Sequence, residues 1–372
     1  GDNGTYSGHV RVYQLLNDSW TQLGSDIDGE TAYDSSGSSV SLSSDGMTLA
    51  IGASANDGNG NASGHVRVFN YDGTAWSQLG SDIDGEAAND QSGYSVSLSS
   101  DGNTVAIGAL YNDGNGNDSG QVRVFNYDGT AWMQLGSDLD GEAASDYSGY
   151  SISLSSDGTT LAISARGNNG NGSDSGHVRI YKFSGITWTK LGSDIEGEAA
   201  NDYSGESVSL SSDGKIVAIG APNNNDNGSN SGHVRVYQFS NDSWAQLGSD
   251  IDGEASTNYS GQSVSLSSDG KTVAIGAPYN SDNGTYSGHV RVYQLLNDSW
   301  TQLGLDINGE ASYNYSGQSV SLSSDGKTVA IGAPYNNDNG SNSGHVRVYN
   351  YYLGFWIQLG SDIDGEAVSD YS

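Results

Sequence analysis

Three features of the sequence predict an all-β fold built from copies of one unit. The first is a strict period, because neighbouring tryptophans in the 372-residue chain are always 56 residues apart. The second is the alternation of apolar and polar residues in short runs, which is typical of strands with one buried face. The third is the scarcity of helix signals, since glycine, asparagine and β-branched residues interrupt every candidate helix. A period of this length marks a chain of repeated supersecondary units. The tryptophans are Trp20, Trp76, Trp132, Trp188, Trp244, Trp300 and Trp356.

Each unit contains four predicted strands, which in the copy at 259–314 are 262–268, 271–278, 289–294 and 300–304. A tight turn at Asp269 and Gly270 joins the first two strands. These two strands are rich in small residues, whereas the last two carry the bulky aromatic residues. Inner strands of a radial array crowd together, so this gradient predicts a β-propeller of four-stranded antiparallel blades. A parallel β-solenoid is the alternative, although its coils are usually shorter.

The phase of the repeat predicts a single domain at 1–372, with an outer half-blade at 1–36 and six 56-residue repeats at 37–372. The chain holds seven outer strand pairs but six inner pairs. We therefore expect a seven-blade geometry in which one blade lacks its inner hairpin. A longer chain could complete that blade, a neighbouring subunit could donate the strands, or six blades could close alone. An exposed blade edge predicts self-association.

Composition limits the partners. The net charge is −32, from 45 acidic and 13 basic residues, which disfavours nucleic acid and anionic membranes and favours cations and basic surfaces. The absence of cysteine excludes disulfides, thiolate metal sites and cysteine nucleophiles. No apolar run is long enough for membrane insertion. Glycosylation sequons such as 17–19 and 227–229 favour an exported glycoprotein, located outside the cell or exposed on a surface.

Histidine and arginine each recur at one repeat position. A catalytic histidine is usually single and has unlike partners, so we expect these histidines to be structural and hydrogen-bonded within their blades. The arginines are expected to pair with a repeated carboxylate. The histidines are His9, His65, His177, His233, His289 and His345, with Gln121 in the remaining copy.

The linker between units is the best candidate for a metal site. Alternating carboxylates followed by glycine open many calcium loops, so the linker predicts bound Ca²⁺ and no other cofactor. A second candidate is the loop 112–118. The alternative is that both segments are Asx-rich turns, with the linker glutamate pairing with the repeated arginine. The predicted ligands are Asp26, Asp28, Glu30, Asp82, Asp84, Glu86, Asp138, Asp140, Glu142, Asp250, Asp252, Glu254, Asp362, Asp364 and Glu366.

The repeat resembles the FG-GAP family, the propeller type of integrin α-chain heads and bacterial surface proteins. Gly-Ala-Pro stands at 220–222, 276–278 and 332–334, and Tyr-Ser-Gly at 147–149 replaces the Phe-Gly element. The resemblance implies a propeller along the whole chain. Integrin-like members carry a calcium-binding run between the first two strands, but 267–270 here is only Ser-Ser-Asp-Gly. That calcium site is therefore not carried over.

The predicted function is a non-catalytic extracellular or surface module for adhesion or recognition, which binds a glycan or a protein through its loops. The alternative is a structural subunit of an extracellular or viral-type fibre or assembly, joined by strand complementation. A hydrolase or lyase on a propeller scaffold is the remote alternative. Since no asymmetric polar cluster is visible in the repeat, we expect no enzymatic activity and no catalytic residue.

Overall fold

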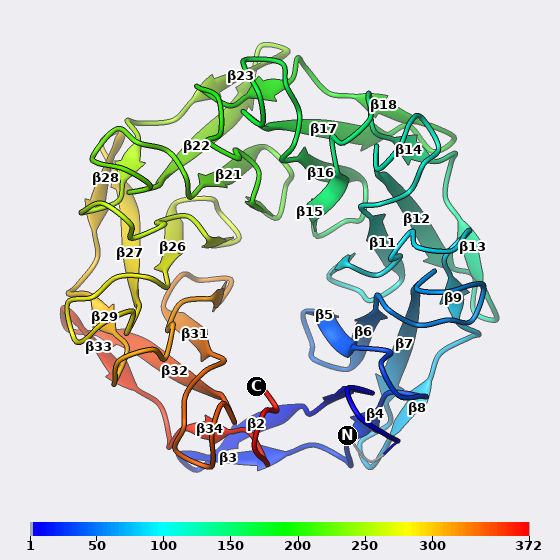
Figure 1. Ribbon diagram of the computed structural model, residues 1–372, viewed down its shortest axis with the longest axis horizontal. Coiled ribbons are helices and arrows are strands. Elements are labelled where there is room, and N and C mark those ends of the chain that lie inside the picture. The colour runs from blue at the N-terminus through cyan, green and yellow to red at the C-terminus, as the bar shows by residue number, and fades with distance from the viewer. Residues whose placement is uncertain (1–2, 372) are drawn as a thin grey trace. The chain divides into compact units, whose positions relative to one another are not determined.

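The computed structural model describes residues 3–371, and the fold is an all-β propeller with six blades of four antiparallel strands (Figure 1). None of the described residues forms a helix long and apolar enough to cross a membrane. The first three blades are β5 (Ser36–Leu42), β6 (Thr48–Ala53), β7 (His65–Tyr71) and β8 (Trp76–Gln78); β10 (Ser95–Leu98), β11 (Thr104–Ala109), β12 (Gln121–Tyr127) and β13 (Trp132–Gln134); and β15 (Ser148–Leu154), β16 (Thr160–Ala165), β17 (His177–Phe183) and β18 (Trp188–Lys190). The last three are β20 (Ser207–Leu210), β21 (Ile216–Ala221), β22 (His233–Ser240) and β23 (Ser243–Gln246); β25 (Ser263–Leu266), β26 (Thr272–Ala277), β27 (His289–Leu296) and β28 (Ser299–Gln302); and β30 (Ser319–Leu322), β31 (Thr328–Ala333), β32 (His345–Tyr352) and β33 (Phe355–Gln358).

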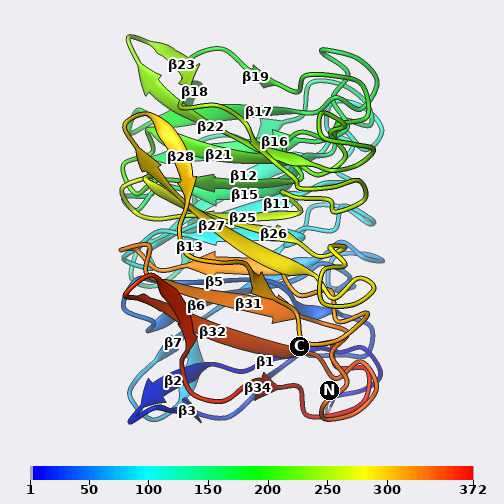
Figure 2. The ribbon, with the colours of Figure 1, turned by 90° about the vertical axis from the view of Figure 1, so that its left-hand side faces the viewer.

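The chain divides into two compact units. The first holds residues up to 14, 21–169 and 176–195. The second holds 15–20, 170–175 and the residues from 196 on. Each unit is built from the same kind of blade, in which consecutive strands pair in order, as Figure 2 shows for β27 and β28.

The inner strands carry small residues because the neighbouring blade approaches their backbone closely. In β26, a Cβ atom added at Gly276 would lie 2.0 Å from the carbonyl oxygen of Gly317 in the next blade. Ser263 of β25 donates a hydrogen bond to the same carbonyl at 2.8 Å. The hairpin turn also forms as predicted, since Gly270 has a φ of +68° and Asp269 accepts a hydrogen bond from the Lys271 amide. The predicted gradient of side-chain size is confirmed.

Within a unit, the repeated tryptophan of an outer strand attaches a blade to the one before it. Trp300 Nε1 donates a hydrogen bond to the Leu247 carbonyl at 2.7 Å, and its ring lies against Gly248. Between these two blades, Val234 and Val236 pack in one core cluster with Val264 and Ile275. The core therefore lies between successive blades, where each buried aliphatic side chain contributes about 2 kcal/mol.

The structure does not support the predicted seven-blade geometry. Residues 9–28 form two separate two-stranded pieces, β1 (His9–Val10) with β4 (Ile27–Asp28), and β2 (Tyr13–Leu16) with β3 (Ser19–Gln22). Among the described residues no inner hairpin pairs with these strands, so they cannot make a four-stranded blade. Two side chains of β5 in the first blade are half-exposed: Val40 is 51% and Leu42 is 48% exposed, against 9% and 7% for their counterparts Val264 and Leu266.

The linker adds a short fifth strand that the sequence did not predict. In the blade of β27, Ile307 and Asn308 pair antiparallel with Val290 and His289 at the start of that strand. This pairing brings the linker alongside the repeated histidine. The short strands are β9 (Ile83–Asp84), β14 (Leu139–Asp140), β19 (Ile195–Glu196), β24 (Ile251–Asp252), β29 (Ile307–Asn308) and β34 (Ile363–Asp364).

Candidate metal centres

The structure divides the carboxylates of each linker between two blades. In the linker after β23, Asp250 lies 4.0 Å from Nδ1 of His233 in its own blade. Glu254 reaches the following blade, where its Oε2 lies 3.9 Å from Nδ1 of His289. The middle residue, Asp252, belongs to the short strand β24 and pairs with His233 through the backbone. The three linker carboxylates therefore do not form one chelating loop.

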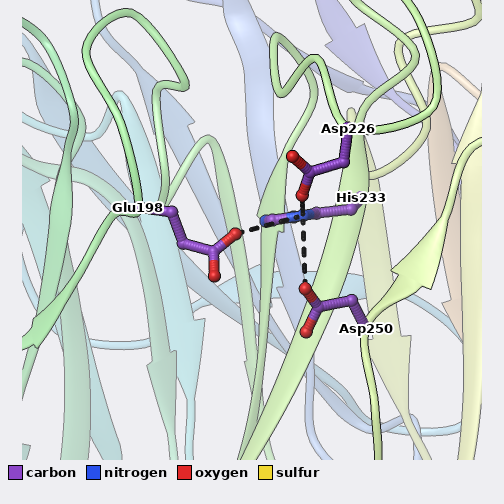
Figure 3. Close-up of side chains that lie close together, drawn as sticks. All are labelled: Glu198, Asp226, His233 and Asp250. Carbon is purple, nitrogen blue, oxygen red and sulfur yellow. Dashed lines mark ion pairs between the residues drawn. The ribbon is translucent and has the colours of Figure 1, made fainter.

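A four-residue cluster forms instead around His233, the first residue of β22 (Figure 3). Its Nδ1 lies 3.7 Å from Glu198 Oε2, 3.8 Å from Asp226 Oδ2 and 4.0 Å from Asp250 Oδ2. The three carboxylates come from three separate segments, namely the preceding linker, the loop between β21 and β22, and the residues after β23. The four ligand atoms lie within 4.8 Å of one another. The cluster is therefore the size of a coordination sphere that needs only a small contraction.

Burial determines the charge state of this cluster. His233 is 1% exposed, and its Nδ1 makes no hydrogen bond. Burial lowers the pKa of His233 to about 4 and Arg235 lowers it further, although Asp250 and Asp226 oppose the shift. The imidazole is then neutral near pH 7 and keeps a lone pair for a metal ion. Burial also raises the pKa of the Glu198 carboxyl, and the nearby Asp250 and Asp226 raise it further, although Arg235 opposes the shift.

The same cluster recurs in the next two blades. His289 Nδ1 and His345 Nδ1 are also buried without a hydrogen bond. Their carboxylates are Glu254, Asp282 and Asp306 for the first, and Glu310, Asp338 and Asp362 for the second. Each set offers one imidazole nitrogen and three carboxylates. This mixed donor set suits Zn²⁺ or Mn²⁺ better than Ca²⁺, which prefers oxygen ligands alone.

The earlier blades have smaller clusters. His65 gathers only Glu30 and Asp82, because Gly58 occupies the position that is Asp226 three units later. In the next blade Gln121 replaces the histidine and donates a hydrogen bond to Asp140 at 3.2 Å. The glycine at this position is therefore what separates a three-residue cluster from a four-residue one.

The first aspartate of most linkers also has a structural partner. Asp26, Asp82, Asp138 and Asp362 each accept a hydrogen bond from the glutamine four residues earlier, at 2.7, 2.6, 2.6 and 2.5 Å. The middle residues Asp84, Asp140, Asp252 and Asp364 lie in the short fifth strands, and Asp28 lies in β4 of the two-stranded piece. Glu366 follows β34, where its carbonyl accepts from Asn339 Nδ2 at 3.3 Å.

The predicted pairing of the linker glutamate with the repeated arginine is confirmed. Arg235 Nη1 lies 3.3 Å from Glu198 Oε1, and its Nη2 donates to the Glu196 carbonyl at 2.8 Å. Glu30, Glu86 and Glu142 lie 3.7, 3.7 and 3.3 Å from the corresponding arginines. The arginine thereby holds one oxygen of the glutamate and leaves the other toward the histidine. The predicted hydrogen bonding of the histidines is wrong for Nδ1 of His233, His289 and His345.

The aspartate between the second and third strands was missed by the sequence analysis. Asp226, Asp282 and Asp338 replace Gly58, Gly114 and Gly170 at this repeat position, and that difference was the available signal. The predicted loop 112–118 forms local turns instead: Asn112 Oδ1 accepts from the Gly114 amide and Asp113 Oδ1 from the Asp118 amide, both at 2.8 Å. Its amide side chains also bond outside the loop, since Asn112 Nδ2 donates to Asp90 Oδ2 at 2.8 Å and Asn115 Nδ2 donates to the Gly141 carbonyl at 2.9 Å.

Comparison with solved structures finds propellers that cover almost the whole chain. A periplasmic gluconolactonase from Pseudomonas aeruginosa shares 14% identity at a TM-score of 0.64, covering 98% of this chain and 95% of its own. A Bacteroides uniformis protein proposed to be a 6-phosphogluconolactonase shares 14% identity at a TM-score of 0.64. The match covers 97% of this chain and 95% of that protein. The hydrazine synthase of Kuenenia stuttgartiensis shares 13% identity at 0.57, covering 89% of each chain. No curated protein matches this chain in sequence.

These matches correct the functional prediction. At 13–14% identity they show a common fold, and proteins with this fold are described as lactonases and a synthase. The predictions of a non-catalytic adhesion module and of no enzymatic activity are therefore wrong as inferences from this architecture. Uniform blades do not exclude catalysis, because reacting groups can be carried by loops at the ends of a shared scaffold.

The repeat itself matches the family expected from its motifs. The FG-GAP repeat matches five segments that together span more than half of the chain, at residues 83–125, 139–181, 196–237, 250–293 and 308–349. The chain belongs to the FG-GAP repeat family.

Proposed function

We propose that this protein is a metal-dependent hydrolase of the propeller type, with its metal ions held by the clusters around His233, His289 and His345. The observation that carries the proposal is the repeated set of one buried imidazole and three carboxylates. A neutral imidazole whose Nδ1 has no hydrogen bond, surrounded by negative charge, favours a divalent cation over the empty arrangement.

A bound divalent cation would lower the pKa of a coordinated water and polarise an ester carbonyl. The side chains of the cluster would bind the ion and fix the orientation of its ligands. His233 offers its lone pair from a buried position, while Asp226 and Asp250 supply charge from opposite sides of the ring (Figure 3). Arg235 holds Glu198 by its other oxygen, so that this carboxylate keeps its orientation. Asp226 is 59% exposed, which leaves the cluster open to a substrate on that side.

The proposed substrates are cyclic esters of sugar acids. Two of the similar propellers are described as gluconolactonases, one of them by proposal, and this class of substrate is taken from them. Hydrolysis of a lactone needs an activated water and stabilisation of the developing oxyanion, both of which a metal centre with an accessible face can supply. The strongly acidic chain disfavours phosphorylated or otherwise highly charged lactones, so a neutral sugar lactone fits best.

The test is hydrolysis of glucono-1,5-lactone by protein stripped with a chelator and then reloaded with Zn²⁺, Mn²⁺ or Ca²⁺. Acid release is followed at constant pH against a blank without protein. We expect activity with Zn²⁺ or Mn²⁺, less with the predicted Ca²⁺, and none in the stripped protein. Equal blank-level rates for every ion would overturn the proposed reaction.

The matched variant is the triple change His233→Gln, His289→Gln and His345→Gln. The fold accepts glutamine at this position, since Gln121 occupies it in another blade. Activity should therefore disappear while the thermal midpoint of the metal-free protein stays the same. Retained activity in this variant would place the reaction elsewhere.

The predicted location outside the cell, the glycosylation of the sequons and the self-association through a blade edge stay predictions. Fractionation of the native source, mass spectrometry of the native chain and sedimentation at increasing concentration test them in turn. A glycan or protein ligand also stays a prediction, and the tyrosines of the second unit bear on it.

A further inference from the structure

Seven tyrosines of the second unit contact one another in the loops and linkers of the last two blades. Neighbouring ring centroids in this tyrosine network are 4.8 to 6.0 Å apart. Elsewhere in the repeat the corresponding tyrosines form only pairs, such as Tyr6 with Tyr33 and Tyr111 with Tyr147. It consists of Tyr259, Tyr279, Tyr286, Tyr313, Tyr315, Tyr335 and Tyr371.

Several of these tyrosines are not needed by the blade itself. The position of Tyr279 and Tyr335 is Ala55, Gly167 and Asn223 in other units. The position of Tyr313 is Asn89, Ser145, Asn201, Thr257 or Ser369 in other units, and a tyrosine again only at Tyr33. Because the fold accepts small residues at both positions, the aromatic rings serve something other than the scaffold.

Tyr313 also stands in a conformation that aromatic residues rarely adopt. Its φ is +66°, in the left-handed region, and its side chain is 54% exposed. Tyr286 has a φ of +51° at a position that is Asp118, Asp174, Asn230 or Asn342 in four units, residues that tolerate this backbone, and Tyr6 or Ala62 in two others. Every described copy of the Tyr313 position has a positive φ, so the backbone belongs to the repeat, and what is particular here is a half-exposed aromatic ring that a ligand can reach.

Five tyrosines of the network, namely Tyr279, Tyr313, Tyr315, Tyr335 and Tyr371, line a recess of about 730 Å³. The ring centroids of Tyr315 and Tyr335 are 5.1 Å apart. The ring of Tyr371 lies edge-on to that of Tyr335, with a centroid distance of 5.4 Å and an interplanar angle of 80°. Amide side chains complete the lining at Gln318, Asn337 and Asn342. The volume lies within the range of roughly 300–1,000 Å³ that is typical of small-molecule sites.

We propose that this tyrosine recess binds a neutral carbohydrate. The apolar C–H face of a pyranose ring packs on a tyrosine ring, while its hydroxyls exchange hydrogen bonds with amides, which both donate and accept. Neither lysine, arginine nor histidine is among the residues lining the recess, and the chain carries a net charge of −32, so an anionic ligand is disfavoured. The Tyr279 and Tyr315 hydroxyls are protonated at neutral pH, as phenols ordinarily are, and can donate hydrogen bonds.

Carbohydrate binding in the recess is a separate proposal from the hydrolysis, because the recess binds its ligand without a metal ion. Its loop is nevertheless shared: the segment between β31 and β32 carries Tyr335, Asn337 and Asn342 of the recess as well as Asp338 of the cluster around His345. Binding is therefore measured in the chelator-stripped full chain, where failure of the recess and failure of the hydrolase give different results.

The experiment is saturation-transfer NMR and calorimetry with maltose, cellobiose, lactose and N,N′-diacetylchitobiose. At least one disaccharide should bind at millimolar concentration or below. The variants Tyr313→Ser and Tyr335→Asn insert residues that other units carry at these positions, and each should weaken binding about tenfold through the loss of one stacked ring. A third variant, Gln318→Tyr, copies Tyr94 and Tyr150 of other units and should block the recess.

The control is Tyr111→Asn, which removes the tyrosine at the same repeat position in another blade. It should leave the affinity unchanged. Absence of binding by all four disaccharides would overturn the proposal, as would an equal loss in the control. Binding of tetramethylammonium but of no disaccharide would show that the rings form a cage for a cation instead.

Discussion

The first three and the last three blades along the chain share one scaffold but differ at one loop position. All six pair four strands in the same order, and five of the six begin the third strand with a buried histidine. The loop before that strand carries Gly58, Gly114 and Gly170 in the first three blades, and Asp226, Asp282 and Asp338 in the last three. The last three therefore hold four-residue clusters, whereas the cluster around His65 has three members. An aspartate in place of glycine at this loop position therefore completes a candidate metal centre around the histidine.

Because the blades share one scaffold, equivalent core substitutions should lower the free energy of unfolding equally in the first three and the last three blades. Ile51 and Ile219 occupy the same repeat position and are both 1% exposed. Ile51→Ala and Ile219→Ala should each lower the free energy of unfolding by about 3 kcal/mol, from lost burial and the cavity left behind. Urea unfolding of both variants checks this. A much smaller effect in one half would mean that the blades are not energetically equivalent.

Changing the loop aspartate should weaken metal binding by the four-residue clusters, which are found in the last three blades. The triple change Asp226→Asn, Asp282→Asn and Asp338→Asn keeps the side-chain shape and removes one charged ligand from each cluster. We expect the affinity for Zn²⁺ or Mn²⁺ to fall about 100-fold, or about 2.7 kcal/mol per site, measured by calorimetry.

The control for that variant is Asp18→Asn, Asp242→Asn and Asp298→Asn. These exposed turn residues have φ values of +62°, +59° and +58°, which asparagine tolerates, and the change in net charge is the same. An equal loss of affinity in the control would attribute metal binding to general acidity rather than to the clusters.

A transplant should create a fourth complete cluster in the first blade. Gly58→Asp adds the missing carboxylate beside Glu30, His65 and Asp82. The Asn56 side chain already accepts a hydrogen bond from the Gly58 amide, as Asn224 does from Asp226, so the loop has the required form. We expect the affinity of this site to rise about tenfold, seen as one additional equivalent in a titration.

Gly114→Asp is the matched control for the transplant, because Gln121 stands there in place of the histidine. It should add no metal equivalent. A gain in the control equal to that of Gly58→Asp would show that the imidazole is not a ligand.

The smallest expected effect concerns the tryptophan that joins successive blades. Trp76 Nε1 donates to the Leu23 carbonyl at 2.8 Å, and Trp300 Nε1 to the Leu247 carbonyl at 2.7 Å. Trp76→Phe and Trp300→Phe remove this bond and should each lower stability by about 1 kcal/mol. The shift in the urea midpoint should be the same for both, since each tryptophan donates to the leucine carbonyl at the equivalent repeat position with nearly the same bond length.

Much of the fold could be predicted because it depends on local patterns repeated many times. The alternation in 262–268 and 271–278, the turn at Gly270 and the small residues of the inner strands each report a local requirement. The ion pair between Arg235 and Glu198 could also be predicted from the sequence, because the arginine and the linker glutamate each recur once per unit. The number of complete blades was not, because the partner strands of the segment 9–28 depend on pairing across the fold.

The sequence by itself determined the repeat, the strands, the acidic surface and the family. Only the tertiary structure decided which carboxylates meet. Asp250 and Glu254 are four residues apart but serve different histidines, because the short strand β24 between them turns the linker from one blade to the next. The tyrosines from 259 to 371 likewise converge only when two blades stand side by side. Spacing along a strand is a local property, whereas a site assembled from three loops depends on distances that the folded blades alone define.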